Sequence, residues 1–376
     1  MSGGLRLATI RGIPVRAEWS VLVIVGLLAW SLATGGLREA APGYGPAAYG
    51  VAAVVTAVVI MASLLAHELG HSFVARRSGI GVRDITLWML GGVSRIEREP
   101  DEPGADLRIA IVGPAVSFAV AAAAGAVAVV VAVGGGPRLL VSCARTVGSV
   151  NLLLGAFNLV PAAPLDGGRV LRAILWRRTG DRTRSALRAT QAGRTFAFFL
   201  GSLGLLAVVG GAAVSGIWLL LLGWFLLEAA RAEEFRVLLG RDLAGVRIGE
   251  IMTADPLTVP ETTTVGAALR DHVLRHRCSG FPVVASDGSV RGLVTLQSLR
   301  EVPPGRRECT PLTAAVRPMA EVARAAPDEL LLDVMARSEP GGESRVLVFD
   351  DGRLVGIVSP TDVTRAVRAA EAVRGP

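Results

Sequence analysis

Two histidines and a glutamate stand at a spacing suited to metal-dependent hydrolysis. In the sequence His67-Glu68-Leu69-Gly70-His71 the histidines are four residues apart, so a helix presents both imidazoles on one face, where they can share a zinc ion. Glu68 lies beside them, placed to polarise a water molecule on the metal. A polar pair buried in a helical bundle, or a purely structural metal site, is the alternative interpretation.

This motif ends an apolar segment of membrane length. Residues 51–66 contain no charged side chain, and a helix of about 20 apolar residues spans the hydrocarbon core of a bilayer. Ionisable side chains at that depth are costly and by default mark functional sites. The sequence therefore predicts an enzyme that hydrolyses a substrate within the membrane.

The motif supplies two ligands, whereas a catalytic zinc ion usually takes three from the protein and leaves a position for water. The chain's other histidines, His272 and His276, lie in a polar segment far along the sequence. The candidate is Asp166, which follows an apolar segment interrupted by Pro161 and Pro164. Broken backbone at membrane depth is tolerated where it is buried in protein or lines a cavity, which suits a metal site. The other interpretation is that Asp166 merely caps the next helix.

The composition indicates several membrane spans and a further, soluble part. The chain has 376 residues, of which 51% are hydrophobic, and its mean hydropathy is +0.51, which excludes a disordered protein. The net charge of +7 comes from arginines alone, and they lie in separate loops rather than one patch, so we expect no nucleic-acid partner. Three scattered cysteines provide neither a disulfide framework nor a cysteine zinc site; they are Cys143, Cys278 and Cys309.

Six apolar segments are long enough to be spans, and loop charge predicts their orientation. The segments are 18–35, 47–68, 107–133, 141–160, 194–213 and 216–231. Arginines crowd the N-terminus, the loops near 76–108 and 169–194, and the segment after 231, whereas the remaining loops hold few. By the positive-inside rule, both termini and the arginine-rich loops face the cytoplasm. The first apolar stretch has no cleavable signal and is expected to remain as a span.

After about residue 240 the pattern changes to two small α/β units. Asp287-Gly288 and Asp351-Gly352 each separate two short β-branched runs, which is typical of a hairpin turn. The two copies lie about 65 residues apart, which indicates an internal repeat. The predicted fold class is thus a multi-span α-helical membrane protein of about six spans with a C-terminal α/β pair.

The first part of the chain resembles the site-2 protease family of intramembrane zinc metalloproteases. The resemblance rests on the 67–71 motif followed by Asn158, Pro161 and Asp166-Gly167, two patterns about 90 residues apart that match independently. It covers roughly residues 5–235 and departs from the family at Glu18, where relatives often carry histidine. No insertion resembling a PDZ domain lies between the spans, which is typical of the compact subgroup.

The resemblance implies a role for each site residue. One zinc ion per chain would be bound by His67, His71 and Asp166, with Glu68 as general base and acid. Asn158 would bond the substrate backbone or the developing oxyanion. A turn at Gly91 and Gly92 would help to hold the substrate as an extended strand.

The repeat resembles a pair of CBS domains, whose Gly-hydrophobic-hydrophobic-Ser/Thr-x-x-Asp segment binds an adenosine nucleotide. In the second copy this implies Ser359 on phosphate and Asp362 on ribose. The first copy offers Thr295 but has Ser298 in place of the aspartate. The implied ligand is ATP or AMP. A structural or dimerising module without a ligand is the alternative, and His272 with its neighbour at 276 is interpreted as a solvated helix face.

Together these observations predict four segments and a function. They are a transmembrane zinc metalloprotease domain at 1–235, a linker at 236–246, and CBS domains at 247–305 and 306–376. The resemblance implies regulated intramembrane proteolysis: hydrolysis of peptide bonds in or near a transmembrane segment of a membrane-anchored regulator, such as an anti-sigma factor, modulated by adenine nucleotide. We expect a multi-pass protein of the cell membrane, in contact with the lipid bilayer, with its termini and CBS domains cytoplasmic and with a homodimer formed through the CBS domains as one option.

Two other functions compete with proteolysis. One is a transporter or channel gated by the CBS pair, in which the buried His, Glu and Asp side chains line an ion path. It leaves the spacing from Asn158 to Asp166 unexplained. The other is an inactive relative that only binds membrane partners, against which the intact ligand set argues.

Overall fold

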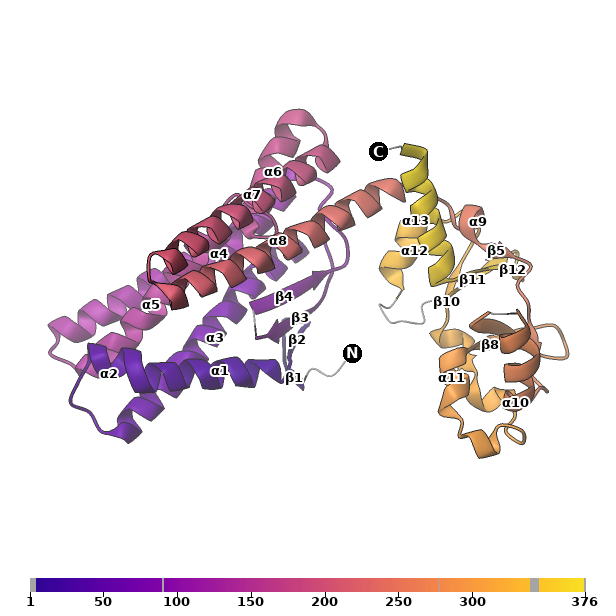
Figure 1. The fold of residues 1–376 in the computed structure, drawn as a ribbon, viewed down its shortest axis with the longest axis horizontal. Helices are drawn as coiled ribbons and strands as arrows, with labels where there is room; N and C mark the ends of the chain where they lie inside the picture. The colour runs from indigo at the N-terminus through magenta and orange to yellow at the C-terminus, as the bar shows by residue number, and fades with distance from the viewer. Residues whose placement is uncertain (1–4, 90, 277, 339–344, 375–376) are drawn as a thin grey trace. The chain divides into compact units, whose positions relative to one another are not determined.

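The structure is a computed structural model that describes residues 5–89, 91–276, 278–338 and 345–374 (Figure 1). The chain forms two compact units, 1–237 and 238–376. The first is a helical bundle with a small sheet and the second consists of two α/β halves, which confirms the predicted fold class. The four predicted segment boundaries stay predictions, and the outermost, Met1 and Pro376, lie outside the described residues.

The helical bundle contains, among the described residues, six helical segments long and apolar enough to cross a membrane. Its helices are α1 (Ser20–Ser31), which continues through a π-helical turn into α2 (Leu37–Ala40), then α3 (Pro46–Arg77), α4 (Pro103–Val133), α5 (Arg138–Asn158), α6 (Asp166–Thr179), α7 (Arg182–Val209) and α8 (Ala213–Asp242). All but α6 belong to candidate spans. The six predicted apolar segments fall on these helices, but most helices extend further into polar sequence.

Glycine and proline set the helix ends and allow close packing. Pro46 and Pro103 occupy the first turns of α3 and α4, where the fixed proline φ suits a helix start. Between α7 and α8 the chain turns at Gly210-Gly211, where Gly211 has a φ of +90°. Small residues let α7 and α8 approach closely, since a Cβ on Gly204 would meet the backbone of α8.

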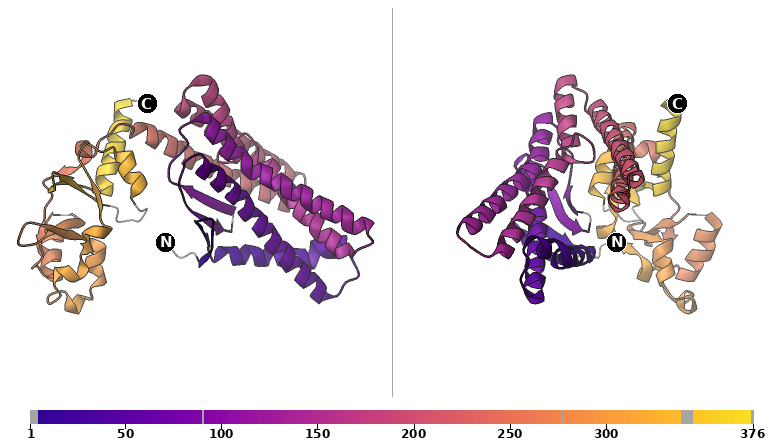
Figure 2. Two further views of the ribbon diagram at one scale, coloured as in Figure 1. Left: turned by 180° about the vertical axis from the view of Figure 1, so that it is seen from behind. Right: turned by 60° about the vertical axis from the view of Figure 1, so that its left-hand side comes forward.

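A four-stranded sheet lies near the ends of α1 and α3 (Figures 1 and 2). Its order is β1-β2-β3-β4, with β1 (Leu5–Ile10), β2 (Ile13–Ala17), β3 (Val82–Trp88) and β4 (Gly91–Ile96). Strands β2 and β3 pair in parallel and the other neighbours are antiparallel. This sheet was not predicted from the sequence, and the predicted turn at Gly91-Gly92 is wrong: both glycines belong to β4, with Gly92 opposite Leu87.

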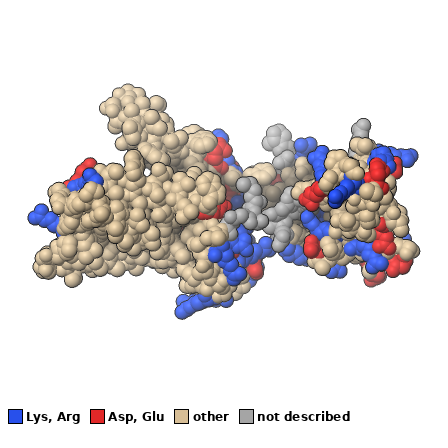
Figure 3. All heavy atoms as spheres, turned by 90° about the horizontal axis from the view of Figure 1, so that it is seen from below, with Lys and Arg blue, Asp and Glu red and all other residues tan. Residues whose placement is uncertain are grey.

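The surface of the helical bundle is apolar over a broad region. In Figure 3 uncharged side chains cover most of this unit, and charged side chains gather toward its ends, whereas both signs of charge are scattered over the second unit. Large apolar residues on α5, α7 and α8 are more than half exposed, as lipid-facing residues are expected to be. The protein is a multi-pass membrane protein.

The second unit is built from two similar sheets. Its helices are α9 (Ile248–Ile251), α10 (Val265–Ala267), which continues as a π-helix to Leu274, α11 (Leu296–Glu301), α12 (Leu331–Arg337) and α13 (Pro360–Arg374). Its strands are β5 (Thr253–Ala254), β6 (Val259–Pro260), β7 (Gly280–Val284), β8 (Val290–Thr295), β9 (Arg317–Pro318), β10 (Ala323–Ala325), β11 (Val346–Asp350) and β12 (Arg353–Val358). The sheet orders are β6-β7-β8-β9 and β10-β11-β12-β5, so each half lends a short strand to the other.

Both predicted hairpins are present in this unit. The turn between β7 and β8 contains Gly288 with a φ of +84°, and the turn between β11 and β12 contains Asp351 and Gly352 with φ values of +46° and +78°. Positive φ at both central positions is typical of the turn that Asp-Gly favours. Buried Leu293, Leu347 and Ile357 share one apolar cluster drawn from both sheets.

Candidate metal centre

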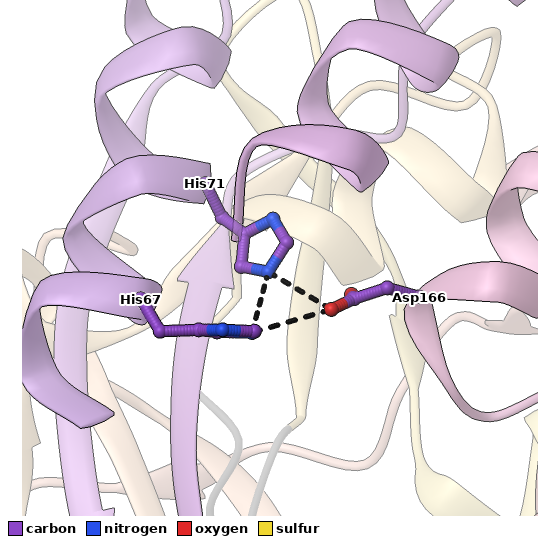
Figure 4. A group of neighbouring side chains, drawn as sticks. All are labelled: His67, His71 and Asp166. Carbon is purple, nitrogen blue, oxygen red and sulfur yellow. Dashed lines mark hydrogen bonds and ion pairs between the residues drawn. The ribbon is translucent and has the colours of Figure 1, made fainter. Parts of the chain in front are cut away.

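His67, His71 and Asp166 meet inside the helical bundle (Figure 4). The Nε2 atoms of the two histidines are 3.2 Å apart, and Oδ2 of Asp166 lies 3.2 Å from Nε2 of His67 and 3.3 Å from Nε2 of His71. Both histidines are buried, and the aspartate side chain is 14% exposed. Three side chains from two separate segments thus point their ligand atoms at one place.

The elements that carry these side chains follow from local sequence. Residues 67–71 lie within the long helix α3, where a spacing of four brings both imidazoles to one face. Helix α5 ends at Asn158, and the chain passes Pro161 and Pro164 before α6 begins at Asp166. The carboxylate of Asp166 reaches the two imidazoles, and no side-chain cap is recorded at the start of α6, so the helix-cap interpretation is not supported.

The far nitrogens of both imidazoles are held by α4. Nδ1 of His71 lies 2.6 Å from the carbonyl oxygen of Ile109, and Nδ1 of His67 lies 2.9 Å from Oγ of Ser117. A carbonyl oxygen can only accept, so Nδ1 of His71 donates, and in the neutral ring its Nε2 carries a lone pair. Fixing the tautomer in this way is how proteins usually orient a metal-binding histidine.

The geometry fits a zinc ion. Zinc bonds of about 2.0–2.1 Å in a tetrahedral arrangement place the ligand atoms about 3.3–3.4 Å from one another. The three separations here, 3.2, 3.2 and 3.3 Å, agree with the edges of one face of that tetrahedron. Two imidazole nitrogens and a carboxylate oxygen are also a ligand set of catalytic zinc sites, with the fourth position left for water or substrate.

Gly113 of α4 makes room for the two rings. A Cβ atom built on Gly113 would collide with the imidazoles of both His67 and His71. The next residue, Pro114, lies within the helix as well. Only a glycine leaves α4 close enough to α3 for Ile109 and Ser117 to reach the rings.

Glu68, predicted as the general base, and the three predicted substrate-binding residues line one cavity with the three ligands. The cavity has a volume of about 1150 Å³, and its lining includes His67, Glu68, His71, Gly91, Gly92, Asn158 and Asp166. A Cβ atom on Gly92 would meet the side chain of Glu68, so the start of β4 lies directly against this carboxylate. Strand β4 is also an edge of its sheet.

A buried ion pair that the sequence analysis did not predict joins α4 to α6. Asp106 is fully buried and accepts hydrogen bonds from Arg172 at 2.8 and 2.9 Å and from Arg169 at 3.3 Å. Burial alone would lower the pKa of the Arg172 guanidinium, but the hydrogen bonds to Asp106 raise it above its ordinary value. Asp106, Ile109, Gly113 and Ser117 recur every three or four residues, which is the one sequence signal that could have revealed this face of α4.

The predicted nucleotide residues of the second unit serve as helix caps. Asp362 is 5% exposed, and its carboxylate accepts from the backbone N–H of Ser359 at 2.9 Å and from its hydroxyl at 2.6 Å. Thr295 is 2% exposed and forms a capping box with Ser298. The two copies therefore use the same positions to start a helix, and a serine replaces the aspartate without loss of the cap.

A groove of about 950 Å³ in the second unit lies elsewhere. It is lined from both halves, by residues that include Asp255, Val290, Arg324, Phe349 and Arg353, but by none of the three predicted nucleotide residues.

The predicted solvated helix face is correct for His276, which is exposed, and wrong for His272, whose ring packs edge-on against Phe281 with centroids 5.9 Å apart.

Two family models match the chain. Peptidase family M50 matches residues 55–146 and 138–201, and the CBS domain matches residues 248–305 and 316–369. The two ranges that match peptidase family M50 together include the three ligand residues and Glu68. The two ranges that match the CBS domain cover the two similar sheets.

Relatives of similar length match nearly the whole chain. The "Putative zinc metalloprotease Rip3" of Mycobacterium tuberculosis is 45% identical over 368 residues, which are 98% of this chain and 93% of the relative. The zinc metalloprotease MJ0392 of Methanocaldococcus jannaschii is 30% identical over 374 residues, 99% of this chain and 98% of the relative. Among solved structures, a site-2 protease from the same archaeon is 31% identical over 61% of this chain and 95% of its own, with a TM-score of 0.40.

Proposed function

This chain belongs to peptidase family M50, the family of the site-2 proteases, and on that premise we propose which of its residues perform the reaction. The protein is an intramembrane zinc metalloprotease with a pair of CBS domains. We assign the zinc ion to His67, His71 and Asp166. The observation that carries the assignment is the triangle of three ligand atoms 3.2–3.3 Å apart.

Glu68 is the general base of the proposed mechanism. Zinc in this site would supply a Lewis acid that activates water and polarises the scissile carbonyl. Glu68 follows His67 on α3 and lines the same cavity, so its carboxylate can take the proton of the attacking water and deliver it to the leaving amine. The two histidines need no role in proton transfer, because Ile109 and Ser117 hold their Nδ1 atoms.

The substrate is proposed to bind along β4 in an extended conformation. An edge strand offers unpaired backbone groups to a further strand, and β4 begins beside Glu68. A transmembrane helix hides its peptide bonds in its own hydrogen bonds and must unwind before attack. Asn158, at the end of α5, lines the same cavity, and we assign to it a hydrogen bond to the substrate carbonyl as charge develops on the oxygen.

The zinc content of the detergent-purified protein tests the assignment directly. We expect close to one zinc ion per wild-type chain, the same in Glu68→Gln, and loss of zinc in Asp166→Ala. Cleavage of a transmembrane peptide should fall about 100-fold or more in Glu68→Gln, as expected for loss of a general base. Unchanged zinc in a folded Asp166→Ala would rule out Asp166 as a ligand, and full activity of Glu68→Gln would rule out Glu68 as the general base. Absence of cleavage by the zinc-loaded wild type would reopen the transporter and inactive-relative alternatives.

The substrate class and the orientation are also proposals. The site-2 protease relationship supports a membrane-anchored regulator, such as an anti-sigma factor, as the substrate. The concentration of arginines in the N-terminal segment, in the loops near 76–108 and 169–194 and after 231 supports a cytoplasmic location for the termini and the CBS pair.

Control by the CBS pair is the last part of the proposal. Adenine nucleotide binding near Ser359 and Asp362 is supported by the match of 316–369 to the CBS domain and by the segment Gly356-Ile-Val-Ser-Pro-Thr-Asp362. Thr295 remains the candidate in the first copy. A homodimer formed through these domains is a further proposal, and its only support is the match to the CBS domain.

A further inference from the structure

The carboxylate of Asp106 has a geometry unlike that of a surface ion pair. It has no exposure to solvent, and both of its oxygens accept from Arg172: Oδ2 from Nε at 2.8 Å and Oδ1 from Nη2 at 2.9 Å. Nη2 of Arg169 adds a third contact at 3.3 Å. Arg172 is itself only 7% exposed. Such a bidentate contact between planar groups fixes direction as well as distance.

The two helices that this contact joins are those that build the metal centre. Arg169 and Arg172 lie on α6, whose first residue is Asp166. Asp106 lies on α4, on the face that also presents the Ile109 carbonyl and Ser117 to the histidines. The same face of α4 therefore contacts the two histidine ligands of α3 and also α6, the helix that carries the third ligand.

We propose that Asp106 is a positioning residue which, through Arg172 and Arg169, sets the register of α6 on α4 and so brings the Asp166 carboxylate to the two imidazoles. The proposal rests on the assignment of zinc to His67, His71 and Asp166. Asp106 touches neither the metal site nor the substrate cavity, whereas both arginines line that cavity.

Two glycines at the start of α6 let it approach the preceding loop closely. A Cβ atom on Gly167 or Gly168 would collide with the backbone of residues 159–163, so the start of α6 lies tightly against its own preceding loop. Glycine packing of this kind permits approach but has little directional preference. A metal site needs its ligands within about 0.5 Å of the productive geometry, and the forked contact to Asp106 supplies that direction.

A purely stabilising role would be an unusual use of this pair. Removing two charges from water costs much of what their attraction returns, so buried ion pairs are often replaceable by apolar side chains without loss of stability. Their best-supported use is to select one arrangement among several. At this position the selected arrangement is the one in which the three ligand atoms form the zinc triangle.

The test measures metal binding and stability separately in the full-length, detergent-purified chain. The zinc dissociation constant is determined by competition with a chelator, the coordination geometry from the absorption spectrum of the cobalt-substituted protein, and folding from thermal unfolding of the metal-free protein. Asp106→Asn keeps the side-chain shape and removes its charge. Arg172→Lys keeps the charge and removes the fork. If Asp106→Asn does not fold, Arg172→Lys carries the test.

A matched control exists in the same unit. Asp84 accepts a bidentate contact from Arg95 at 2.7 and 2.6 Å and joins β3 to β4 rather than α4 to α6. Asp84 is 6% exposed, and the Arg95 side chain is 48% exposed. We expect zinc binding to weaken about 10-fold or more in Asp106→Asn and Arg172→Lys, within the range known for residues that orient metal ligands, and the cobalt spectrum to change. Asp84→Asn should leave both unchanged.

Two results would overturn the proposal. One is a folded Asp106→Asn or Arg172→Lys whose zinc dissociation constant and cobalt spectrum equal those of wild type, with only the unfolding temperature lowered. The other is an equal loss of zinc affinity in Asp84→Asn, which would indicate a general effect of destabilisation. Failure of the zinc assignment itself is recognised separately, because Asp166→Ala would then retain its zinc.

Discussion

At the scale of single residues, the metal centre depends on groups that carry no reactive side chain. The Ile109 carbonyl fixes the tautomer of His71, and Gly113 leaves the space in which both rings stand. Neither residue has a chemistry that would mark it in a sequence. Their contribution is to keep three ligand atoms 3.2–3.3 Å apart in a buried place, where an uncompensated cluster of lone pairs would be unfavourable without a cation.

Gly113→Ala should abolish zinc binding while leaving the bundle folded. The added methyl group would occupy the space of the His67 and His71 rings, which cannot move without losing the triangle. The matched control is Gly125→Ala on the same helix, where a Cβ atom meets nothing within 4 Å. Zinc content of the two purified variants is the measurement. Equal zinc in both would show that the rings have room to shift.

At the scale of elements, strand β4 connects the sheet to the catalytic helix. Its first residues pair with the end of β3 and at the same time lie against Glu68 of α3. A substrate segment that extended this sheet would therefore pass the proposed general base. The contact also explains the glycine at position 92, since any side chain there would push the Glu68 carboxylate aside.

Gly92→Ala should lower the turnover number and leave zinc content unchanged. The new Cβ atom would displace Glu68, which is not a proposed ligand, so proton transfer is expected to suffer by about 10-fold to 100-fold. Gly50→Ala is the control, because it makes the same change on α3 at a position where a Cβ atom meets nothing within 4 Å. The measurement is cleavage of a transmembrane peptide beside metal analysis. Loss of zinc in Gly92→Ala would mean that β4 supports the ligands and not the base.

The first turn of α13 offers a test of the nucleotide proposal. The Asp362 carboxylate already accepts hydrogen bonds from the backbone N–H and the hydroxyl of Ser359, so a nucleotide that uses this carboxylate must compete with them. We expect AMP or ATP binding, measured by calorimetry, to be lost in Asp362→Ala and retained in Ser298→Ala, the equivalent position of the first copy. Both changes weaken a cap by about 0.5–2 kcal/mol, so their stabilities are comparable. Wild-type binding in Asp362→Ala would remove this residue from the proposed site.

At the scale of the whole molecule, a membrane-spanning unit is followed by a polar, α/β one. The helical bundle exposes apolar side chains over a broad surface, whereas charges of both signs are scattered over the face of the second unit that Figure 3 shows. The two halves of the second unit exchange the short strands β5 and β9, so neither half has a complete sheet of its own. We therefore expect the CBS pair to fold as one piece.

The proposed orientation can be read from native cysteines. Cys278 and Cys309 are exposed in the second unit, and Cys143 lies half-buried on α5. In a Cys143→Ser background, a membrane-impermeant maleimide should label inside-out vesicles and leave right-side-out cells unlabelled. Labelling of intact cells would place the CBS pair outside and contradict the positive-inside assignment.

Features that depend on residues close to one another in the sequence could be predicted from the sequence alone. The pairing of His67 with His71 needs only a helical repeat, six spans follow from length and hydropathy, and the Asp-Gly hairpins follow from turn chemistry. Asp166 was inferred because two histidines leave a catalytic zinc one ligand short. The helices nevertheless run beyond the predicted spans, because a hydropathy criterion detects the lipid-embedded part and not the polar turns that continue it, as in the arginine-rich start of α7.

Only the tertiary structure decided what stands around these residues. The sheet β1-β2-β3-β4 depends on parallel pairing between β2 and β3, which are separated by two long helices, and no local pattern specifies that. Ile109, Gly113, Ser117 and Asp106 acquire their roles because α4 packs against both α3 and α6. Local sequence determines which face a side chain occupies, whereas helix packing determines what that face meets, and the metal centre depends on both.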